Sequence, residues 1–253
     1  MDTETERIPD EKVQEYEEQA KKRRLVLPGD ELGYGIAGSG TYIEHGKIIS
    51  KVIGLAEVKN DHHFVIPLNG VYTPKRGDGV IGIIKEVGFS KWTVDINSPY
   101  SAVLSLSEGV NEFVDLTKTD LTKYYDLNDI IFAKVQTVTK SRMVVLTMKD
   151  RRCRKLFGGR IIKITPTKVP RVIGKNGSMV ELIKKKTKCQ IVVGQNGLVW
   201  IRGEYRHLAA EAIKKIEAYA HIVGLTNKID EFLTKKLEET GISEEIKGEK
   251  NEE

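Results

Sequence analysis

The tetrapeptide Gly174-Lys175-Asn176-Gly177 combines residue types that can hold an anion. Its two glycines let the backbone pass close to a phosphate, and Lys175 places a positive charge beside it. The apolar pattern predicts short helices on both sides, at 169–173 and 178–186, so the N–H groups that open the second helix face the same anion. An ordinary helix–helix turn with a glycine cap is the alternative interpretation of this loop.

Basic side chains surround the loop. Arg171 and Lys168 lie just before it and are the nearest further cations. Four lysines follow within 184–188, although residues that close on one helix cannot all face one ligand. Residues 151–228 carry 18 Lys and Arg against four Glu and no Asp, a net charge of +14, whereas the whole chain carries +5. Such a cationic segment predicts a surface for a polyanion, and a solvated helix face is the alternative.

The elements around the loop follow a definite order. A strand is predicted before the two helices, and a hairpin and a longer helix after them. The hairpin turns at Asn196-Gly197, because both residue types tolerate a positive φ. The order strand, helix, helix, strand, strand, helix, with a Gly-x-x-Gly loop between the first two helices, resembles a type I KH domain, placed at residues 161–225. The resemblance implies that Gly174, Lys175, Asn176 and Gly177 bind the backbone of a nucleic acid.

The segment before this domain alternates in the manner of β-strands. Strands are predicted at 80–87, 92–96, 102–106, 130–138 and 142–148, and the last two form a hairpin. Five strands in about 70 residues fit an OB-type barrel. The opening Gly77-Asp78-Gly79-Val80-Ile81, followed in order by Val94-Asp95-Ile96, Leu104-Ser105-Leu106 and Val144-Val145-Leu146, resembles an S1 RNA-binding domain, placed at residues 73–150.

OB barrels hold single strands in a cationic groove with exposed aromatic side chains on their second and third strands. Here Thr93 and Ser105 stand where S1 domains usually have an aromatic residue and a histidine. Trp92 shares the alternation of the apolar residues on its strand and is therefore predicted to lie in the core. The RNA-contacting candidates are the residues in or beside the loops, Lys91, Phe89 and Tyr100.

The remaining segments complete a multidomain α+β organisation. Residues 25–72 hold short β-prone runs between glycines and turn pairs, so we expect a small N-terminal β domain there. Residues 1–24 contain eight acidic and six basic side chains and are expected to form a charged arm. Residues 151–160 are predicted to be a basic linker. Residues 226–253 are predicted to be an amphipathic segment followed by an acidic tail.

Two other patterns are weaker candidates for binding sites. Gly33, Gly35 and Gly38 match a dinucleotide-binding Gly-x-Gly-x-x-Gly motif, but that motif requires a helix immediately afterwards, and β-prone sequence follows here. His62 and His63 are adjacent on a predicted strand and so point to opposite faces, which does not favour a metal site.

The sequence excludes several classes of protein. No apolar run reaches the roughly 18 residues of a membrane span, and no secretory signal opens the chain, so we expect a cytoplasmic protein. Cys153 and Cys189 are far apart and fit reduced thiols. No nucleophile–base set or carboxylate cluster is recognisable, which predicts no catalytic residue, no cofactor, no metal and no small-molecule substrate.

The whole arrangement resembles the RNA-binding cap subunit of the archaeal exosome, of the ribosomal-RNA-processing-protein-4 type. The resemblance covers residues 25–225 and includes Gly194-Gln195-Asn196-Gly197, a turn characteristic of that family. It implies a non-catalytic subunit present in three copies on a hexameric ring of RNase PH-like subunits. The N-terminal β domain would dock onto the ring, and the S1 domains would surround a pore through which single-stranded RNA is degraded from its 3′ end.

Two alternatives stay open from the sequence. The first is a stand-alone S1/KH RNA-binding factor in translation or RNA processing, which would not associate with the ring. The second is a nuclease with a hidden active site, which would degrade RNA by itself.

Overall fold

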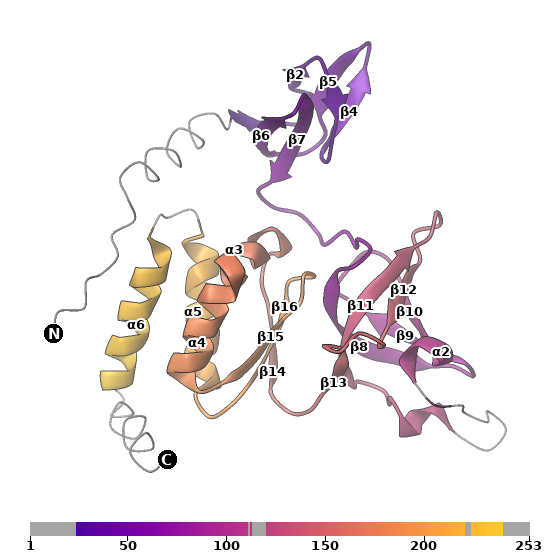
Figure 1. Ribbon diagram of the computed structural model, residues 1–253, viewed down its shortest axis with the longest axis vertical. Helices are drawn as coiled ribbons and strands as arrows, with labels where there is room; N and C mark the ends of the chain where they lie inside the picture. Colours follow the sequence, from indigo (N-terminus) through magenta and orange to yellow (C-terminus); the bar gives the residue numbers. More distant parts are fainter. Residues whose placement is uncertain (1–23, 111, 113–119, 221–223, 240–253) are drawn as a thin grey trace. The chain divides into compact units, whose positions relative to one another are not determined.

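The computed structural model describes residues 24–110, 112, 120–220 and 224–239 (Figure 1). Of the charged arm expected at 1–24, all but Arg24 lies outside the described residues, as do residues 240–253 of the amphipathic segment and acidic tail expected at 226–253. The chain divides into two compact units, with the boundary between Gly70 and Val71. Within the described ranges, no helix is both long enough and apolar enough to cross a membrane.

The first unit is the N-terminal β domain. Its strands are short: β1 (Arg24–Val26), β2 (Glu31–Gly33), β3 (Ile36–Ala37), β4 (Thr41–Glu44), β5 (Lys47–Ser50), β6 (Gly54–Lys59) and β7 (His62–Pro67). They form one sheet in the order β1-β6-β7-β3 and a second in the order β2-β5-β4. Val26, Ile48 and Val65 are buried between them.

The β-prone runs of this domain in the sequence are 41–43, 48–53 and 63–68, and strand β6 is not among them. Its Ala, Glu and Lys residues have weak β-propensity, so the local pattern does not reveal it. Its central place in the sheet explains why it forms, because β1 pairs along one of its edges and β7 along the other.

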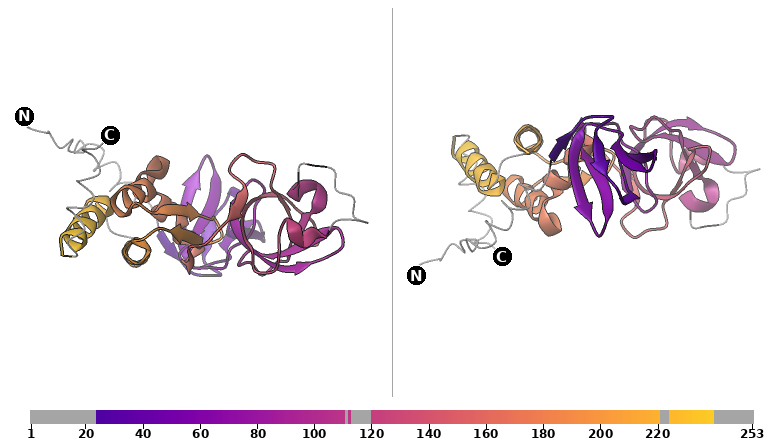
Figure 2. Two further views of the ribbon diagram at one scale, coloured as in Figure 1. Left: turned by 90° about the horizontal axis from the view of Figure 1, so that it is seen from below. Right: turned by 90° about the horizontal axis from the view of Figure 1, so that it is seen from above.

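The second unit begins with a closed barrel. Its strands are β8 (Gly79–Val87), β9 (Lys91–Asp95), β10 (Ala102–Ser105), β11 (Ile130–Val138) and β12 (Val144–Thr147). Helix α2 (Leu106–Gly109) and the 3-10 helix η1 (Leu121–Lys123) lie between β10 and β11 in the chain. Parallel pairing of β10 with β12 and antiparallel pairing of β11 with β12 close the sheet into the ring seen end-on in Figure 2.

The barrel confirms the five-strand OB-type prediction and the predicted hairpin between its last two strands. Trp92 is completely buried in its core, and its indole N–H donates to the carbonyl of Tyr125 at 2.9 Å, as the core prediction requires. Tyr72, placed at the end of the first domain on sequence, packs in the barrel core, and its hydroxyl donates to Asp78 at 2.7 Å.

The expected linker contains a strand, β13 (Arg154–Leu156), which pairs antiparallel with the start of β11. Leu156 is buried, whereas Arg154 is exposed. The segment is therefore fixed to the barrel by a backbone ladder rather than being a free tether. Its many charged residues hid this strand in the sequence.

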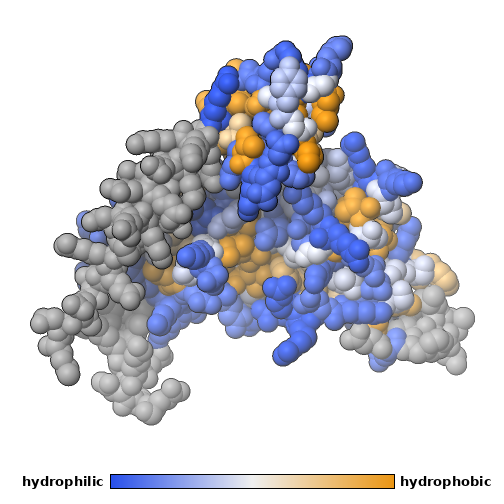
Figure 3. Space-filling model, turned by 45° about the horizontal axis from the view of Figure 1, so that its top comes forward, coloured by the Kyte–Doolittle hydropathy of each residue, from blue (hydrophilic) through white to orange (hydrophobic). Residues whose placement is uncertain are grey.

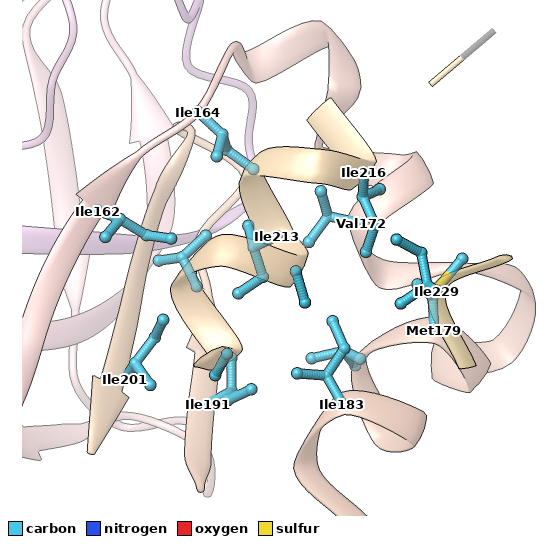
Figure 4. Packing of buried hydrophobic residues seen from close by; sticks show 14 of the residues in the cluster. Ile162, Ile164, Val172, Met179, Ile183, Ile191, Ile201, Ile213, Ile216 and Ile229 are labelled. Carbon is cyan, nitrogen blue, oxygen red and sulfur yellow. The ribbon is translucent and has the colours of Figure 1, made fainter. Parts of the chain in front are cut away.

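The KH domain follows with the predicted order of elements. These are β14 (Arg160–Lys163), η2 (Pro166–Lys168), α3 (Val169–Ile173), η3 (Lys175–Gly177), α4 (Ser178–Thr187), β15 (Gln190–Val193), β16 (Leu198–Arg202) and α5 (Arg206–Ala218), with α6 (Leu225–Glu239) after them. The antiparallel sheet has the order β14-β16-β15. The helices cover one face of it, and Ile183, Ile213 and Ile216 fill the space between them (Figure 4). Helix α6 adds Leu225, Ile229 and Leu233 to the same core.

The barrel and the KH domain also share a small core of their own. Ile81 from β8 and Leu156 from β13 pack with Leu198 and Trp200 from β16. The Trp200 indole N–H donates to the carbonyl of Gly158 at 2.7 Å. These contacts join the two domains through apolar surface, and the Trp200 side chain also holds the segment that connects them.

The hairpin between β15 and β16 is confirmed, but its turn differs from the expectation of two positive φ angles. Gly197 has a φ of +77°, whereas Asn196 is not among the residues with positive φ. The Asn196 side chain turns into the barrel, where its amide donates to the carbonyls of Ile81 at 2.7 Å and Ile96 at 2.8 Å. Its carbonyl oxygen accepts from the N–H of Ile81 at 3.3 Å. These three bonds, rather than the turn's own preference, fix the conformation of Asn196.

Candidate nucleic-acid interface

The Gly174–Gly177 loop leaves α3 and enters α4 through left-handed backbone. Gly174 has a φ of +76°, and a Cβ added there would lie 2.7 Å from the N atom of Met179, so only glycine brings the loop this close to α4. Asn176 has a φ of +54°, which asparagine tolerates better than most residues. The Gly177 N–H donates to the Gly174 carbonyl at 3.3 Å and closes the turn. Lys175 and Asn176 are both exposed.

This geometry suits a phosphate. Helix α4 has ten residues, and its N-terminal end carries the positive side of the helix dipole next to the Lys175 ammonium. Glu181 in the first turn of α4 opposes this potential. Lys175 is therefore the group that makes the loop attractive to an anion.

The other two KH candidates lie in different surroundings. Arg171 is exposed in the last turn of α3, directly before the loop. Lys168 stands before the first turn of α3, and its ammonium donates to the Glu217 carbonyl at the end of α5, 3.0 Å away. The structure thus brings Arg171 towards the loop and holds Lys168 against α5, at the opposite end of α3.

The barrel candidates lie near opposite ends of strand β9. Phe89 is 77% exposed in the turn between β8 and β9, and Lys91 is exposed at the first position of β9. Tyr100 lies after β9, in the connection to β10. Strand β9 has five residues and is therefore about 16 Å long. Lys91 begins this strand opposite Ser105 at the end of β10, and Tyr100 follows the far end of β9. The length of β9 thus separates Tyr100 from Phe89 and Lys91. The structure groups Phe89 with Lys91 but not with Tyr100.

Tyr100 has a cationic partner that the sequence did not single out. The guanidinium of Arg142 lies 5.5 Å from the centre of the Tyr100 ring, and its Nη1 donates to the Tyr100 hydroxyl at 3.1 Å. Arg142 lies in the turn between β11 and β12, which the parallel pairing of β10 with β12 brings to this end of the barrel. In the sequence, only the basic residues of that turn, Lys140 and Arg142, indicated a cation there.

The thiols are not poised for chemistry. Burial raises the pKa of the Cys153 thiol, and the nearby Asp150 carboxylate raises it further. Burial also raises the pKa of the Cys189 thiol. Both groups therefore stay protonated at neutral pH, which removes their nucleophilic form.

The histidine pair and the glycine motif of the N-terminal domain behave as structural elements. His62 is exposed and His63 is buried, as expected for neighbours on strand β7. Strand β3 lies within the glycine motif, and strand β4, not a helix, follows it. Across the described ranges, no three His, Cys, Asp or Glu side chains are grouped in a way that could hold a metal ion.

Comparisons with protein families cover all three domains. Residues 23–69 match the family described as the exosome RNA binding protein RRP4 N-terminal domain. Residues 71–137 match the RRP4 S1 domain, and residues 159–205 match a KH domain.

Similar proteins align over most of the chain. The exosome complex component Rrp4 of Pyrococcus furiosus is 48% identical over 236 residues, covering 89% of each chain. The protein of the same name from Thermococcus kodakarensis is 47% identical and covers 89% of this chain and 92% of the relative. A solved structure described as an exosome complex RNA-binding protein is 37% identical and covers 66% of this chain and 97% of its own, with a TM-score of 0.60. With these relatives and a barrel and KH domain built as described above, the chain belongs to the Rrp4 family of RNA-binding exosome components.

Proposed function

We propose that this chain is the RNA-binding cap of an archaeal exosome in the cytoplasm. Three copies sit on a hexameric ring of RNase PH-like subunits, capture single-stranded RNA and direct its 3′ end into the pore. The observation that carries the proposal is the exposed Gly174–Gly177 loop, in which Lys175 stands beside the N-terminal end of α4.

A single strand is the form of RNA that fits these surfaces. KH domains clamp the backbone of about four nucleotides at this loop and leave the bases open to contact. On the barrel, exposed Phe89 beside Lys91 offers an aromatic face and a cation, the pair of groups that single-strand-binding barrels use. A duplex presents neither free bases nor a single flexible backbone to such sites.

The N-terminal domain supports docking onto the ring. Leu25 of β1, Leu55 of β6 and Ile66 of β7 are cross-strand neighbours and therefore share one face of the sheet. Leu25 is 58% exposed and Ile66 39%, whereas Val26 and Val65 on the other face are buried. Figure 3 shows hydrophobic side chains at the surface of this domain among hydrophilic ones. An exposed apolar face of this kind is typical of a surface that a partner covers.

The chain contributes binding rather than bond cleavage. A strand held above the pore stays at high effective concentration for the ring, so successive cleavage events follow without release of the RNA. The expected consequence is more processive decay at an unchanged rate of the chemical step.

The test combines this chain with an archaeal RNase PH-like ring. Light scattering gives the mass of the complex, and decay of a single-stranded RNA is followed with and without the chain. We expect three chains per ring, longer runs of degradation and no degradation by the chain alone. RNA binding without ring association would identify a stand-alone factor, and degradation by the chain alone would identify a nuclease.

Paired variants separate docking from RNA binding. Changing Leu25 and Ile66 to Lys places two charges on the apolar face and is expected to abolish ring association while RNA affinity is retained. Val58→Lys is the control, because Val58 is 58% exposed on β6 but belongs to the opposite face. Equal loss of association in both variants would contradict docking through this face.

A further inference from the structure

The dipeptide Asn-Gly occurs three times in the chain, at Asn69-Gly70, Asn176-Gly177 and Asn196-Gly197. Asparagine is a chemically labile residue, because the main-chain nitrogen that follows it can attack its side-chain amide. A glycine in the following position leaves this attack unhindered, since it has no Cβ. The three pairs therefore share one intrinsic reactivity, and the fold determines which of them reacts.

The reaction consumes water and releases ammonia. The N atom of the glycine forms a bond to the Cγ atom of the asparagine, and the bond between Cγ and Nδ2 breaks. The departing amide nitrogen takes the proton of the glycine N–H with it and leaves as ammonia. Water then opens the cyclic imide at either of its two carbonyl carbons. The product is aspartate or isoaspartate, and each carries one negative charge in place of a neutral amide.

The fold protects Asn196 from this reaction. Its side chain is completely buried, so water for the second step is excluded. Its Nδ2 atom donates to the carbonyls of Ile81 at 2.7 Å and Ile96 at 2.8 Å. Departure of Nδ2 as ammonia leaves both carbonyls buried without a donor, which makes the product unfavourable.

Asn176 has none of these restraints. It is exposed, and its side chain makes no hydrogen bond with any residue that the structure describes. The attacking group is the Gly177 N–H, and its bond to the Gly174 carbonyl is 3.3 Å long. This distance is beyond the usual limit of about 3.2 Å for such a bond. Water thus reaches the amide, and ring closure at Asn176 breaks only one long hydrogen bond.

The feature that attracts a phosphate to this loop also favours ring closure. The Gly177 nitrogen must give up its proton, and negative charge develops on it as it does so. Gly177 directly precedes the first residue of α4, so the positive end of the helix dipole and the Lys175 ammonium stabilise that charge. Asn69 is exposed as well, but Gly70 does not open a helix.

We propose that Asn176 is a deamidation site and that its conversion ends the anion binding of the Gly174–Gly177 loop. The new carboxylate offsets the Lys175 charge and stands at the N-terminal end of α4, where a phosphate would bind. In isoaspartate the main chain also runs through the former side chain, and the extra methylene group alters the turn. The loss of RNA binding rests on the proposed function, whereas the deamidation itself does not.

Mass spectrometry of the full chain, aged at mildly alkaline pH and then cut into peptides, measures conversion at each Asn-Gly pair separately. We expect Asn176 to convert at least about tenfold faster than Asn196, whose hydrogen bonds protect it, and several-fold faster than Asn69. Conversion of Asn176 no faster than that of Asn196 would overturn the proposal.

The same chain aged in guanidinium chloride is the control for the role of the fold. Unfolding removes both the protection of Asn196 and the helix beside Asn176, so the three pairs should then convert at rates within about threefold of one another. If Asn196 stayed the slowest by the same margin in the unfolded chain, its neighbours in the sequence and not the fold would be the cause.

The RNA affinity of the aged chain tests the consequence. Fluorescence anisotropy with a single-stranded RNA should show several-fold weaker binding once Asn176 has converted. Asn176→Gln keeps a neutral amide, but its longer side chain closes the ring far more slowly, so this variant should keep its initial affinity over the same period. Asn69→Gln is the matched control and should lose affinity as fast as the unchanged chain. Full conversion of Asn176 with unchanged affinity would contradict the loss of binding.

The outcomes distinguish this proposal from the proposed function. A freshly purified chain that binds no RNA would overturn RNA binding, while the peptide masses would still test the deamidation site. A fresh chain that binds RNA and shows no conversion at Asn176 would overturn the deamidation site alone.

Discussion

Two nearly identical tetrapeptides lie twenty residues apart in the KH domain, and one is exposed to solvent whereas the other is buried against the barrel. Gly174-Lys175-Asn176-Gly177 and Gly194-Gln195-Asn196-Gly197 differ only at their second residue. Each closes a turn with a bond from its last N–H to its first carbonyl, of 3.3 Å in the first and 3.2 Å in the second. Yet Asn176 is exposed to solvent, whereas Asn196 is completely buried.

The difference comes from what lies next to each turn. The second tetrapeptide faces the barrel, and the Asn196 side chain satisfies three main-chain groups of β8 and the end of β9. The first faces solvent beside the end of α4 and leaves its lysine free to meet an anion. The comparison teaches that a Gly-x-Asn-Gly motif specifies a turn. Whether the turn has a structural role or binds a ligand depends on what it faces, another domain or solvent.

The largest expected effect comes from replacing the two asparagines by alanine. Asn196→Ala leaves one N–H and two carbonyls of the barrel buried without partners and should lower the free energy of unfolding by about 3 kcal/mol. Asn176→Ala removes no buried bond and should cost about 1 kcal/mol, because alanine is less suited to a positive φ. Urea unfolding of the full chain compares the two. Equal losses would contradict the assigned roles.

The last glycines of the two turns allow a sharper comparison. Gly177 and Gly197 have φ angles of +86° and +77°, so alanine suffers similar backbone strain at both. A Cβ at Gly197 would lie 2.4 Å from the Ile164 carbonyl oxygen, whereas at Gly177 the nearest atom is 3.9 Å away. Gly197→Ala should therefore cost about 2 kcal/mol more than Gly177→Ala, measured by thermal or urea unfolding. A difference below the error of the measurement would mean that the junction relaxes freely.

RNA affinity should follow the first turn and not the second. Lys175→Asp/Asn176→Asp reverses charge at exposed positions and should weaken binding by about tenfold, or 1.4 kcal/mol, without unfolding the domain. The control exchanges the second residues, Lys175→Gln with Gln195→Lys, and keeps the net charge constant. We expect this exchange also to weaken binding, by several-fold in a filter-binding assay. Unchanged affinity after the exchange would show that only total charge matters.

The smallest expected effect is a dependence of the free energy of unfolding on pH, which comes from Glu217. Burial tends to raise the pKa of Glu217, but hydrogen bonds from Lys214 and from the N–H and hydroxyl of Thr165 outweigh it and hold the pKa below its usual value. A lowered carboxyl pKa stabilises the fold above the ordinary glutamate pKa of about 4.3, and this stability is lost as the pH falls through the lower folded value. Unfolding measured from pH 7 to pH 3 should show the loss, and Glu217→Gln should reduce it. An identical pH profile in the variant would exclude Glu217 as its source.

Local pattern was sufficient for much of the fold. Alternation located all five barrel strands and placed Trp92 in the core, because each strand has one face on that core. It missed β6 and β13, whose residues have weak β-propensity or carry charge and which are held by strands already in place. Neighbouring strands, not their own sequence, make these two segments extended.

The candidate site shows the same limit. Two glycines around Lys175 identify the loop, because all the residues that form it are consecutive in the sequence. Phe132 and Arg154 are on different strands of the barrel sheet, and Ile191 is on a KH strand, so their position around one pocket depends on how the barrel and the KH domain pack. The burial of Asn196 depends on the same packing, and for that reason the sequence indicated a turn there but not its partner.

The bonds of Asn196 also determine how mutations can accumulate at this junction. All three end on main-chain atoms of Ile81 and Ile96, which every amino acid except proline provides in the same form. Other amino acids can therefore replace Ile81 and Ile96, within the limits of core packing, while the hydrogen bonds persist. Asn196 has no such latitude, and no exchange of a partner side chain can compensate for its loss. The evolutionary constraint on the contact between two domains thus falls on one residue of one of them.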